Sequence, residues 1–485
     1  MLGAMARPAD SVTAERLSLV LLFAVAGILR VHGAWAAPPL SGFDGPFHAA
    51  NIGILLFEGR LPLPHEGWST FHPPLYYALS AGLWALLPDD WSAHPVLFTL
   101  RLLNVAASLA LGAAVLCAAR MVLPGRPLAA FTATALALFL PMEIGPSFLL
   151  GNEMFGAALS AWSVVALLAC LRPGASWRAS VALGVVLGLA VLTKFNTASV
   201  ALAAAAALLV HDLWRRGASP GALSRTATVA GIALVLAGWY FAWNFALYGQ
   251  PILMQNEIVS AHMAKSGYGP SRELSRYLSL DPEILTLRLE LLMPANQAKA
   301  SPAVWPVTFA SVWFDLYSTV LLAPSRAGRL AAWILYACGA LFTLLAAVGG
   351  VALLRAPRGS GRFVAGAALL GVIALALLAY GVFTWRVATF SALKGSYLSP
   401  SLLPFCVLAG AGCERLLALG RVARAALVGL LAIFVATATA IFWVGWLAPL
   451  PFNPGTFYLR AYSDAATERV YDFFVGGDPQ ARGAR

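Results

Sequence analysis

Two acidic positions stand where a carboxylate could do chemistry at a membrane surface. Asp44 follows the apolar run 17–37 and stands just before a short helix predicted over 46–58, and the pair Asn152-Glu153 opens a later apolar run. An acid near the first turn of a helix can simply stabilise the helix start, and both local patterns fit that structural role. A carboxylate can also take a proton from a hydroxyl group that acts as a nucleophile. Asp44 is therefore a candidate general base.

Three basic residues stand at the ends of other apolar runs. Lys194 lies in a polar turn, Lys394 precedes one of the last runs, and Arg101 opens the second run. A cation at the end of a membrane helix can bind an anionic ligand, or it can extend toward lipid headgroups and serve as an anchor. Because Asp89 and Asp90 lie close to Arg101 in the sequence, we expect this arginine to pair with an acid of the first loop.

The first predicted loop, 38–97, carries further polar and aromatic side chains. His48 follows Asp44 by about one helical turn, and a His-Pro-Pro-Leu-Tyr-Tyr element includes His72 and Tyr76. The paired prolines rigidify the start of a short helix, 75–87, whose length suits a position at the membrane surface better than a full span. Its aromatic residues also fit a plain interfacial belt.

Composition places all of these residues in a membrane protein. The chain of 485 residues is 60% hydrophobic and only 11% charged, whereas soluble domains carry about 25% charged residues. The net charge of +11 comes from short loops between apolar runs, a pattern set by membrane topology, so we expect no nucleic-acid partner. The five cysteines lie in or beside apolar segments without metal-binding spacing and are expected to pack.

The sequence predicts an all-α polytopic membrane protein with about eleven transmembrane helices. Arg30 and His32 interrupt the first apolar run before a small-residue site that resembles a signal-peptide cleavage site, so we expect an uncleaved helix. The predicted spans are 17–37, 98–119, 128–148, 154–171, 179–193, 196–211, 227–247, 328–354, 363–385, 398–414 and 425–448.

The distribution of arginine supports this division of the chain. With the N-terminus in the cytoplasm, every predicted inside loop is short and basic, as the positive-inside rule requires. If 75–87 were a full span and 179–211 a single helix, Arg120 and Arg126 would face outward and the turn at Glu153 inward. We therefore expect a cytoplasmic N-terminus and polar loops on the extracytoplasmic side.

The long loops then gather on one face of the membrane. The predicted transmembrane domain covers 1–448 and includes the first loop and a large loop, 248–327, whose Gly, Pro and Ser content suggests a flap. A short extracytoplasmic tail, 449–485, follows. Polar residues at one membrane surface suit an enzyme that acts on a lipid-borne substrate better than a transporter with polar residues at the midplane.

The motifs taken together resemble a known family. An acid after the first helix, the His-Pro-Pro-Leu-Tyr-Tyr element and the opening Asn-Glu pair come in the order seen in GT-C glycosyltransferases. The resemblance is to the bacterial relatives of protein O-mannosyltransferases and lipid A aminoarabinose transferases, over residues 15–415. The remaining matching elements are Leu192-Thr193-Lys194, Trp239-Tyr240 with Asn244, Tyr248-Gly249, and Lys394 with Tyr397 and Pro400.

The resemblance implies an activity and a set of roles. A sugar would pass, usually with inversion, from a polyprenyl-phosphate carrier to an acceptor hydroxyl on the periplasmic side of the cytoplasmic membrane. Asp44 matches the family's catalytic acid, although Gly45 stands where a second acid often follows. The acceptor site would include Asn152 and Glu153; Lys194, Lys394 and Arg101 would bind the donor phosphate; and His48, His72, Tyr76 and Tyr397 would contact substrate.

Several alternatives stand beside this interpretation. A transporter or flippase of lipid-linked sugars would show internal repeats and charges deep in its helices, and a non-catalytic relative in envelope assembly would explain the missing second acid. The acceptor could be a lipid, a glycan or a protein. No cofactor is expected with certainty, but Asp44, His48 and Glu153 together offer ligands for a divalent metal ion.

Overall fold

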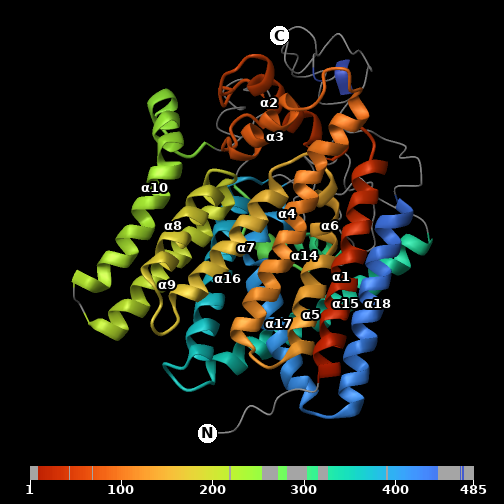
Figure 1. Ribbon diagram of the computed structural model, residues 1–485, viewed down its shortest axis with the longest axis vertical. Helices are drawn as coiled ribbons and strands as arrows, with labels where there is room; N and C mark the ends of the chain where they lie inside the picture. The colour runs from red at the N-terminus through yellow and green to blue at the C-terminus, as the bar shows by residue number, and fades with distance from the viewer. Residues whose placement is uncertain are drawn as a thin grey trace.

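The computed structural model describes a bundle of helices that runs the length of the molecule (Figure 1). The described residues are 9–42, 44–67, 69–217, 220–253, 271–280, 303–314, 326–388, 392–445, 470 and 472–474, and they contain helices and no strand. The tail predicted over 449–485 and much of the predicted loop 248–327 lie outside them. The described α-helices (α) and 3₁₀ helices (η) are, in chain order, α1 (Ala9–Ala36), α2 (Gly45–Phe57), α3 (Leu75–Ala85), α4 (Ala93–Val122), α5 (Pro127–Phe139), α6 (Pro141–Ile144), η1 (Gly145–Phe148), α7 (Glu153–Cys170), α8 (Trp177–Val191), η2 (Phe195–Thr197), α9 (Ala198–Arg216), α10 (Pro220–Tyr248), α12 (Ser275–Leu278), α14 (Val304–Trp313), α15 (Arg326–Leu354), α16 (Gly361–Arg386), η6 (Gly395–Ser401), α17 (Leu402–Leu417) and α18 (Arg421–Gly445).

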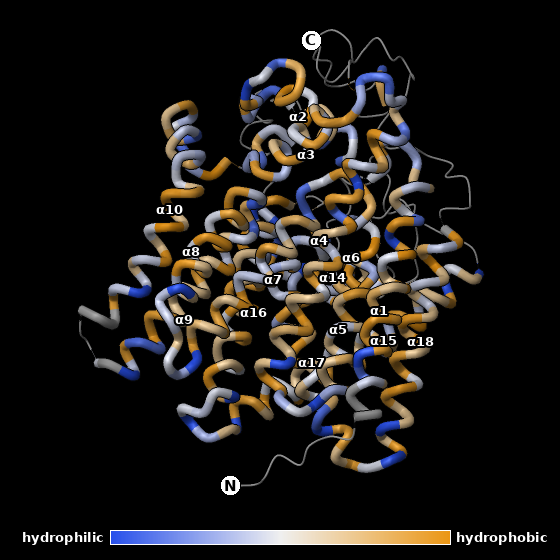
Figure 2. Tube along the Cα trace, in the orientation of Figure 1, coloured by the Kyte–Doolittle hydropathy of each residue, from blue (hydrophilic) through white to orange (hydrophobic). Residues whose placement is uncertain are grey.

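The all-α polytopic class predicted from the sequence is confirmed, but the count of eleven spans is not. Each predicted run overlaps a described helix, although the run 128–148 is divided among α5, α6 and η1. Nine helices of the described chain are long and apolar enough to cross a membrane, or ten if the bent pair α5 and α6–η1 forms one span. The 15 residues of α8 extend about 22 Å, which is less than the hydrocarbon thickness of about 30 Å. Figure 2 shows apolar residues along the long helices and hydrophilic ones gathered near their ends.

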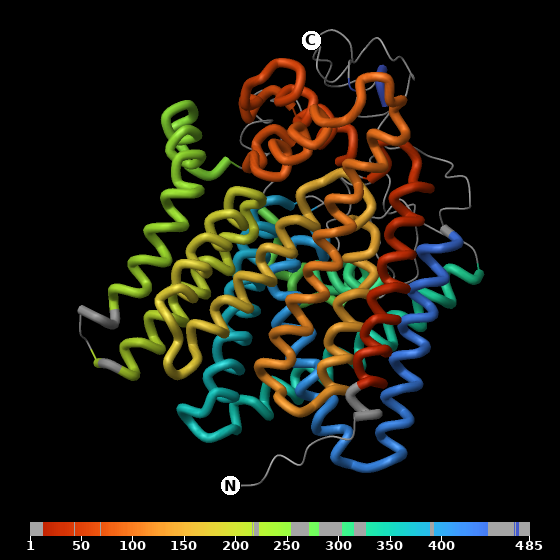
Figure 3. The backbone as a smooth tube through the Cα atoms, viewed as in Figure 1, coloured from red at the N-terminus to blue at the C-terminus, as the bar shows by residue number. Residues whose placement is uncertain are grey.

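The two ends of the bundle differ in character. At one end, α2 and α3 pack against each other and lie across the ends of the long helices (Figure 1). At the other end, arginines lie in or beside the turns that follow α4, α7, α15 and α17, and we call this the basic end. The backbone trace shows α1 and α18 side by side along one flank of the bundle, although they come from opposite ends of the chain (Figure 3).

The short helices α2 and α3 form a folded cap because their aromatic residues are buried. Tyr76, Tyr77 and Trp84 of α3 are fully buried, and Trp84 packs against Phe473 and Phe474 from near the C-terminus. The main chain of α3 is also tied to the bundle, since the Leu75 amide donates to the Leu192 carbonyl after α8 at 3.1 Å. The His-Pro-Pro-Leu-Tyr-Tyr element is thus part of a small hydrophobic core.

A buried arginine stabilises a break in the bundle. Pro141 ends α5, the chain bends by 60° into α6 and η1, and the carbonyl of Leu138 loses its usual helical partner. Arg30 donates to that carbonyl at 2.6 Å and to the Ser108 hydroxyl at 2.7 Å, and its side chain is fully buried. A charged group inside a membrane bundle requires such partners. The break turns the backbone at Met142 toward the cap.

Close packing of α15 against α17 fixes the last segment that reaches the cap. Gly412 lies against the Leu345 carbonyl, and Gly349 against the Leu408 carbonyl, so closely that a Cβ atom at either glycine would overlap the carbonyl oxygen. Small residues allow helix backbones to approach in this way. Since η6 leads directly into α17, this contact sets the height of η6 in the bundle.

We predict that Gly412→Ala lowers the stability of the folded protein by about 1–3 kcal/mol, because the two helices must separate to admit the methyl group. The same change at Gly371, which has no atom within 4 Å of its Cβ position, should be neutral or stabilising by up to about 1 kcal/mol because alanine favours the helix. Thermal unfolding of the purified variants in detergent measures both. Equal melting temperatures for the two variants would contradict this packing.

Candidate active site

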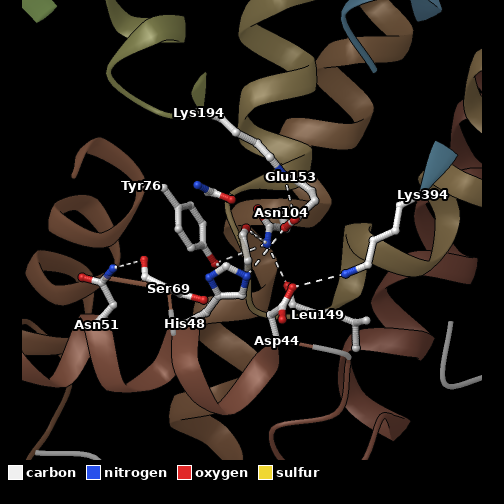
Figure 4. A network of polar contacts seen from close by, with 12 residues as sticks. Asp44, His48, Asn51, Ser69, Tyr76, Asn104, Leu149, Glu153, Lys194 and Lys394 are labelled. Carbon is white, nitrogen blue, oxygen red and sulfur yellow. Dashed lines mark hydrogen bonds and ion pairs between the residues drawn. The ribbon is translucent and has the colours of Figure 1, made fainter. Parts of the chain in front are cut away.

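Two carboxylates and two lysines from four distant parts of the chain meet beneath the cap (Figure 4). Asp44 and Glu153, together with His48 and Lys394, border a cavity of about 90 Å³. We call it the polar cavity because of these four side chains. The segments around the cavity are the start of α2, the chain from α6 to the start of α7, the end of α14 and the start of η6. The structure therefore brings together the acids that the sequence singled out separately.

Asp44 pairs with Lys394 across 350 positions of sequence. The Lys394 ammonium lies 3.3 Å from Asp44 Oδ2, and both side chains are only partly exposed. The Asp44 carboxylate makes no capping hydrogen bond to α2, so the helix-cap role is not what holds it. Burial by itself would lower the pKa of Lys394, but the neighbouring Asp44 carboxylate raises it above its ordinary value. The lysine is therefore an ammonium ion at neutral pH.

Glu153 pairs with Lys194 at the start of α7. The Lys194 ammonium lies 2.7 Å from Glu153 Oε1 and sits 5.7 Å from the centre of the Tyr397 ring. The side-chain amide of Asn152 donates to the Thr193 carbonyl at 2.9 Å and makes no capping bond to its own helix. The pair Asn152-Glu153 thus fastens α7 to the turn between α8 and α9.

His48 is a buried imidazole that faces Glu153. Its Nδ1 lies 2.8 Å from the Tyr77 hydroxyl, and its Nε2 lies 3.8 Å from Glu153 Oε2. If Nδ1 carried the proton, the Nε2 lone pair would face a carboxylate, and the Tyr77 hydroxyl would lack a recorded acceptor among the described residues. With the proton on Nε2, Tyr77 donates to Nδ1 and the Nε2–H faces the cavity. We assign that tautomer to His48.

Burial sets the charge of these aromatic and imidazole groups. It lowers the pKa of His48 below the ordinary 6.5, with Glu153 only partly opposing it, and raises the pKa of Tyr77 well above 10.0. The ring of His72 stacks on His48 at 6.0 Å between centroids, and burial also lowers the pKa of His72. Both imidazoles are neutral at pH 7, and His48 acts as a neutral hydrogen-bond donor.

The floor of the cavity is main chain, held in place by Tyr76 and Asn104. The Asn104 amide donates to the carbonyls of Leu149 and Gly151 at 2.7 and 2.9 Å, and the Gly151 amide donates to the Tyr76 hydroxyl at 3.2 Å. A Cβ at Gly151 would lie 2.6 Å from Glu153 Oε2, so a side chain there would displace the carboxylate. Tyr76 therefore helps to position the cavity floor through Gly151, without lining the cavity itself.

The structure separates the predicted site residues into two groups. Asp44, His48, Glu153 and Lys394 line the cavity. The other predicted residues, Asn152, Lys194, His72, Tyr76, Tyr397 and Arg101, are not among its lining side chains. Three of them, Lys194, His72 and Tyr76, contact residues that do line it.

Arg101 lies apart from this cluster. Its guanidinium donates to the carbonyls of Ala34, Ala37 and Pro38 at 2.6–3.1 Å and is buried. The expectation that Arg101 pairs with Asp89 or Asp90 was therefore wrong. The carbonyls at the C-terminal end of α1 lack helical partners, and the arginine satisfies them.

Other residues of the site gave little sequence signal. Ser311 and Gly395 line the cavity, and the Gly395 amide donates to the Ser311 hydroxyl at 2.7 Å. Ser311 belongs to a short apolar helix, α14, which the sequence placed inside a loop. Tyr77 could have been found, because it stands beside Tyr76 in the recognised element, but its contact with His48 depends on how α3 packs on α2.

The cluster does not have the form of a metal site. Within the described part of the chain, no group of three or more His, Cys, Asp or Glu side chains is arranged to hold a metal ion. The combination of Asp44, His48 and Glu153 considered from the sequence does not form such a group. Each carboxylate already has a lysine beside it, and an ammonium ion repels a second cation.

A second, apolar cavity of about 590 Å³ adjoins the polar one. Met142, just after the break between α5 and α6, lines both cavities, so they are neighbours in the structure. The walls of the apolar cavity are aromatic and aliphatic side chains of α14, α16, η6 and α17. The segment η6 borders both, since Lys394 and Ser396 line the polar cavity and Leu398 lines the apolar one.

We predict that His48 makes the stability of the protein depend on pH. The pKa of His48 is lower in the folded protein than in the unfolded chain. As the pH falls below about 6.5, the unfolded chain therefore takes up the proton first, and the free energy of unfolding decreases. Between about pH 7.5 and about pH 5, the melting temperature of the wild type should fall more than that of His48→Gln. The exposed His94 provides a control: His94→Gln should keep the wild-type dependence. Parallel curves for wild type and His48→Gln would contradict the assignment.

Comparison with known proteins gives matches to solved structures alone. The sequence matches no protein-family model and no curated protein. The structure is similar to ArnT from Cupriavidus metallidurans bound to undecaprenyl phosphate, with a TM-score of 0.55 and 15% identity over 88% of this chain and 76% of that one. It is also similar to an Archaeoglobus fulgidus oligosaccharyltransferase tethered to an acceptor peptide, with a TM-score of 0.56 and 15% identity.

The archaeal match covers 95% of this chain but only 59% of the oligosaccharyltransferase, so the chain spans well under two thirds of that protein. A further structure of the archaeal enzyme AglB, in complex with an inhibitory peptide and a dolichol-phosphate, matches with a TM-score of 0.55 and 13% identity, over 96% of this chain and 60% of that one. At these identities the likeness establishes the fold. The chain therefore shares its transmembrane fold with ArnT and with the archaeal oligosaccharyltransferase.

Proposed function

We propose that this protein transfers a sugar from a polyprenyl-phosphate donor to an acceptor hydroxyl at the cavity between Asp44 and Glu153. The observation that carries the proposal is the junction of two unlike cavities. A polar cavity with two carboxylate–lysine pairs beside it adjoins a larger apolar cavity at Met142. A polyprenyl phosphate has the same two parts, a charged head and a long apolar chain. Solved structures of similar fold contain undecaprenyl phosphate or a dolichol-phosphate.

The segment η6 supports a specific placement of the donor. Lys394 and Ser396 line the polar cavity at the start of η6, and Leu398 and Leu402 line the apolar one farther on. A phosphate near the Lys394 ammonium would therefore leave the polyprenyl chain beside the apolar walls. Of the two site lysines, Lys394 is the better phosphate ligand, because Lys194 does not line the cavity.

The proposed reaction is a single displacement. The acceptor oxygen attacks the anomeric carbon as the bond from that carbon to the phosphate oxygen breaks, and the configuration inverts. The acceptor proton passes to the Asp44 carboxylate, and the bonding electrons leave with the polyprenyl phosphate. Lys394 stabilises the charge that grows on the phosphate oxygens. A bound phosphate would also compete with Asp44 for the Lys394 ammonium.

Glu153 and His48 are placed to orient the substrates. Glu153 is one quarter exposed on the cavity side and is held by Lys194, so its free oxygen can accept a hydrogen bond from a substrate hydroxyl. The Nε2–H of His48 can donate to a neighbouring oxygen. We infer that Asn152 and Lys194 act as positioning residues that fix the direction of Glu153.

The distribution of charge supports a location for the site. We place the site at the extracytoplasmic face of the cytoplasmic membrane and the N-terminus in the cytoplasm, because the basic end lies opposite the site (Figure 1). The acceptor is a hydroxyl of a lipid, a glycan or a protein, and both hexosyl and pentosyl donors fit the proposed chemistry.

We predict that Asp44→Asn still folds, because the amide oxygen can accept a hydrogen bond from the Lys394 ammonium. The turnover should fall by about 10²–10⁴-fold, because the amide cannot take up the acceptor's proton. The measurement is the loss of labelled sugar from a panel of polyprenyl-phosphate sugars incubated with purified protein and a membrane extract that supplies acceptors. Asp90→Asn is the matched control, because Asp90 is exposed in the same loop and should keep full turnover. An Asp44→Asn variant with wild-type turnover would remove Asp44 as the base.

We predict that Lys394→Gln weakens the binding of undecaprenyl phosphate by roughly 10–100-fold, the loss expected for a charge-assisted hydrogen bond. Undecaprenol, which lacks the phosphate, should bind both proteins equally. The variant Asp44→Asn with Lys394→Gln controls for the carboxylate left unpaired in the single variant, and it should bind as weakly as Lys394→Gln. Recovery of affinity in the double variant would show that repulsion by Asp44, and not the loss of the lysine, caused the effect.

A further inference from the structure

A third cavity, of about 330 Å³, lies at the basic end of the bundle, far from the candidate active site. It is bordered by the end of α4, the end of α7 and the turn that joins α15 to α16. Apolar side chains make up most of its wall, among them Val122, Leu168, Leu171 and Val364. Its two charged lining residues are arginines, Arg172 and Arg362, and no acidic residue lines it.

The surroundings of this cavity carry an excess of positive charge. Arg362 and Arg126 both bind one carboxylate, that of Glu414, with nitrogen–oxygen distances of 2.5 and 3.0 Å. Two guanidinium groups on one carboxylate leave one positive charge uncompensated. Arg172 is exposed, and no acid within ion-pair distance of it is recorded in the described part of the chain. The cavity therefore has two positive charges in excess beside an apolar wall.

The position of the cavity along the helices indicates what class of ligand fits it. The helices that border the cavity end here after crossing the bundle. In a membrane we therefore expect the arginines at the level of the lipid phosphates and the apolar wall at the level of the acyl chains. A free phosphate would use the arginines and leave the apolar wall unused. A zwitterionic lipid would bring an ammonium group for which the lining offers no carboxylate.

We propose that this cavity binds one anionic phospholipid. The phosphodiester accepts hydrogen bonds from Arg172 and Arg362, and one acyl chain packs along Leu168, Leu171 and Val364. The lipid would then bridge α7 to the turn before α16 and stabilise the bundle at the end opposite the site. This inference is independent of the proposed glycosyl transfer, because it concerns stability and lipid binding alone.

To test this, phosphatidylglycerol, phosphatidylcholine or inorganic phosphate is added to the purified, delipidated protein. Thermal unfolding measures the melting temperature, and native mass spectrometry counts the bound molecules. Phosphatidylglycerol should raise the melting temperature and remain bound as one molecule, and the other two should do neither. Arg172→Gln should weaken phosphatidylglycerol binding about five-fold, since one arginine near anionic lipid contributes about 1 kcal/mol. Arg172 makes no recorded ion pair, so this variant should fold as the wild type does.

Arg178→Gln is the matched control, because Arg178 is exposed at the same end of the bundle but does not line the cavity. It should bind phosphatidylglycerol as the wild type does. An equal loss in Arg178→Gln would mean that a diffuse basic surface attracts the lipid, and the site would be overturned. Equal stabilisation by phosphatidylcholine, or full stabilisation by inorganic phosphate, would overturn it as well.

Discussion

Charged groups that are largely buried at the end of an apolar bundle need partners, and the rest of the site depends on how this chain meets that requirement. The Asp44–Lys394 pair joins the first loop to the segment before α17, and the Glu153–Lys194 pair joins α7 to the turn before α9. Removing one partner would leave a largely buried charge without its counter-ion in a medium of low dielectric constant, which is costly. The pairs therefore hold four segments together and place two carboxylates beside one cavity.

The same requirement explains the break between α5 and α6. A bent helix frees backbone carbonyls that no water can satisfy inside a membrane. Arg30 satisfies the carbonyl of Leu138, and the bend brings Met142 and Pro146 to the wall of the polar cavity. A residue that hydropathy marks only as an interruption of the first helix is therefore part of the structure that shapes the site.

The narrow polar cavity owes its form to main chain as much as to side chains. Glycines at 45, 151 and 395 border it, and a Cβ at each would contact a neighbouring carbonyl or side chain closer than atoms normally approach. Backbone can then lie close to a substrate. The apolar cavity has the opposite construction, with large side chains of α14 and α17 around an open space. A narrow polar cavity beside a wider apolar one suits a ligand with one charged end and one apolar end.

The sequence by itself determined the membrane class, the position of nearly every helix, and the acids and lysines that form the cluster, because hydropathy and charge at helix ends are local properties. It did not determine the number of spans, since a 15-residue apolar helix such as α8 is too short to assign by composition. Only the tertiary structure decided that Lys394 lines the cavity and Lys194 stands behind Glu153, that Arg101 caps α1, and that Tyr77 orients His48. Those contacts join positions from 29 to 350 residues apart, and their geometry is set by how helices pack against each other, which no local pattern records.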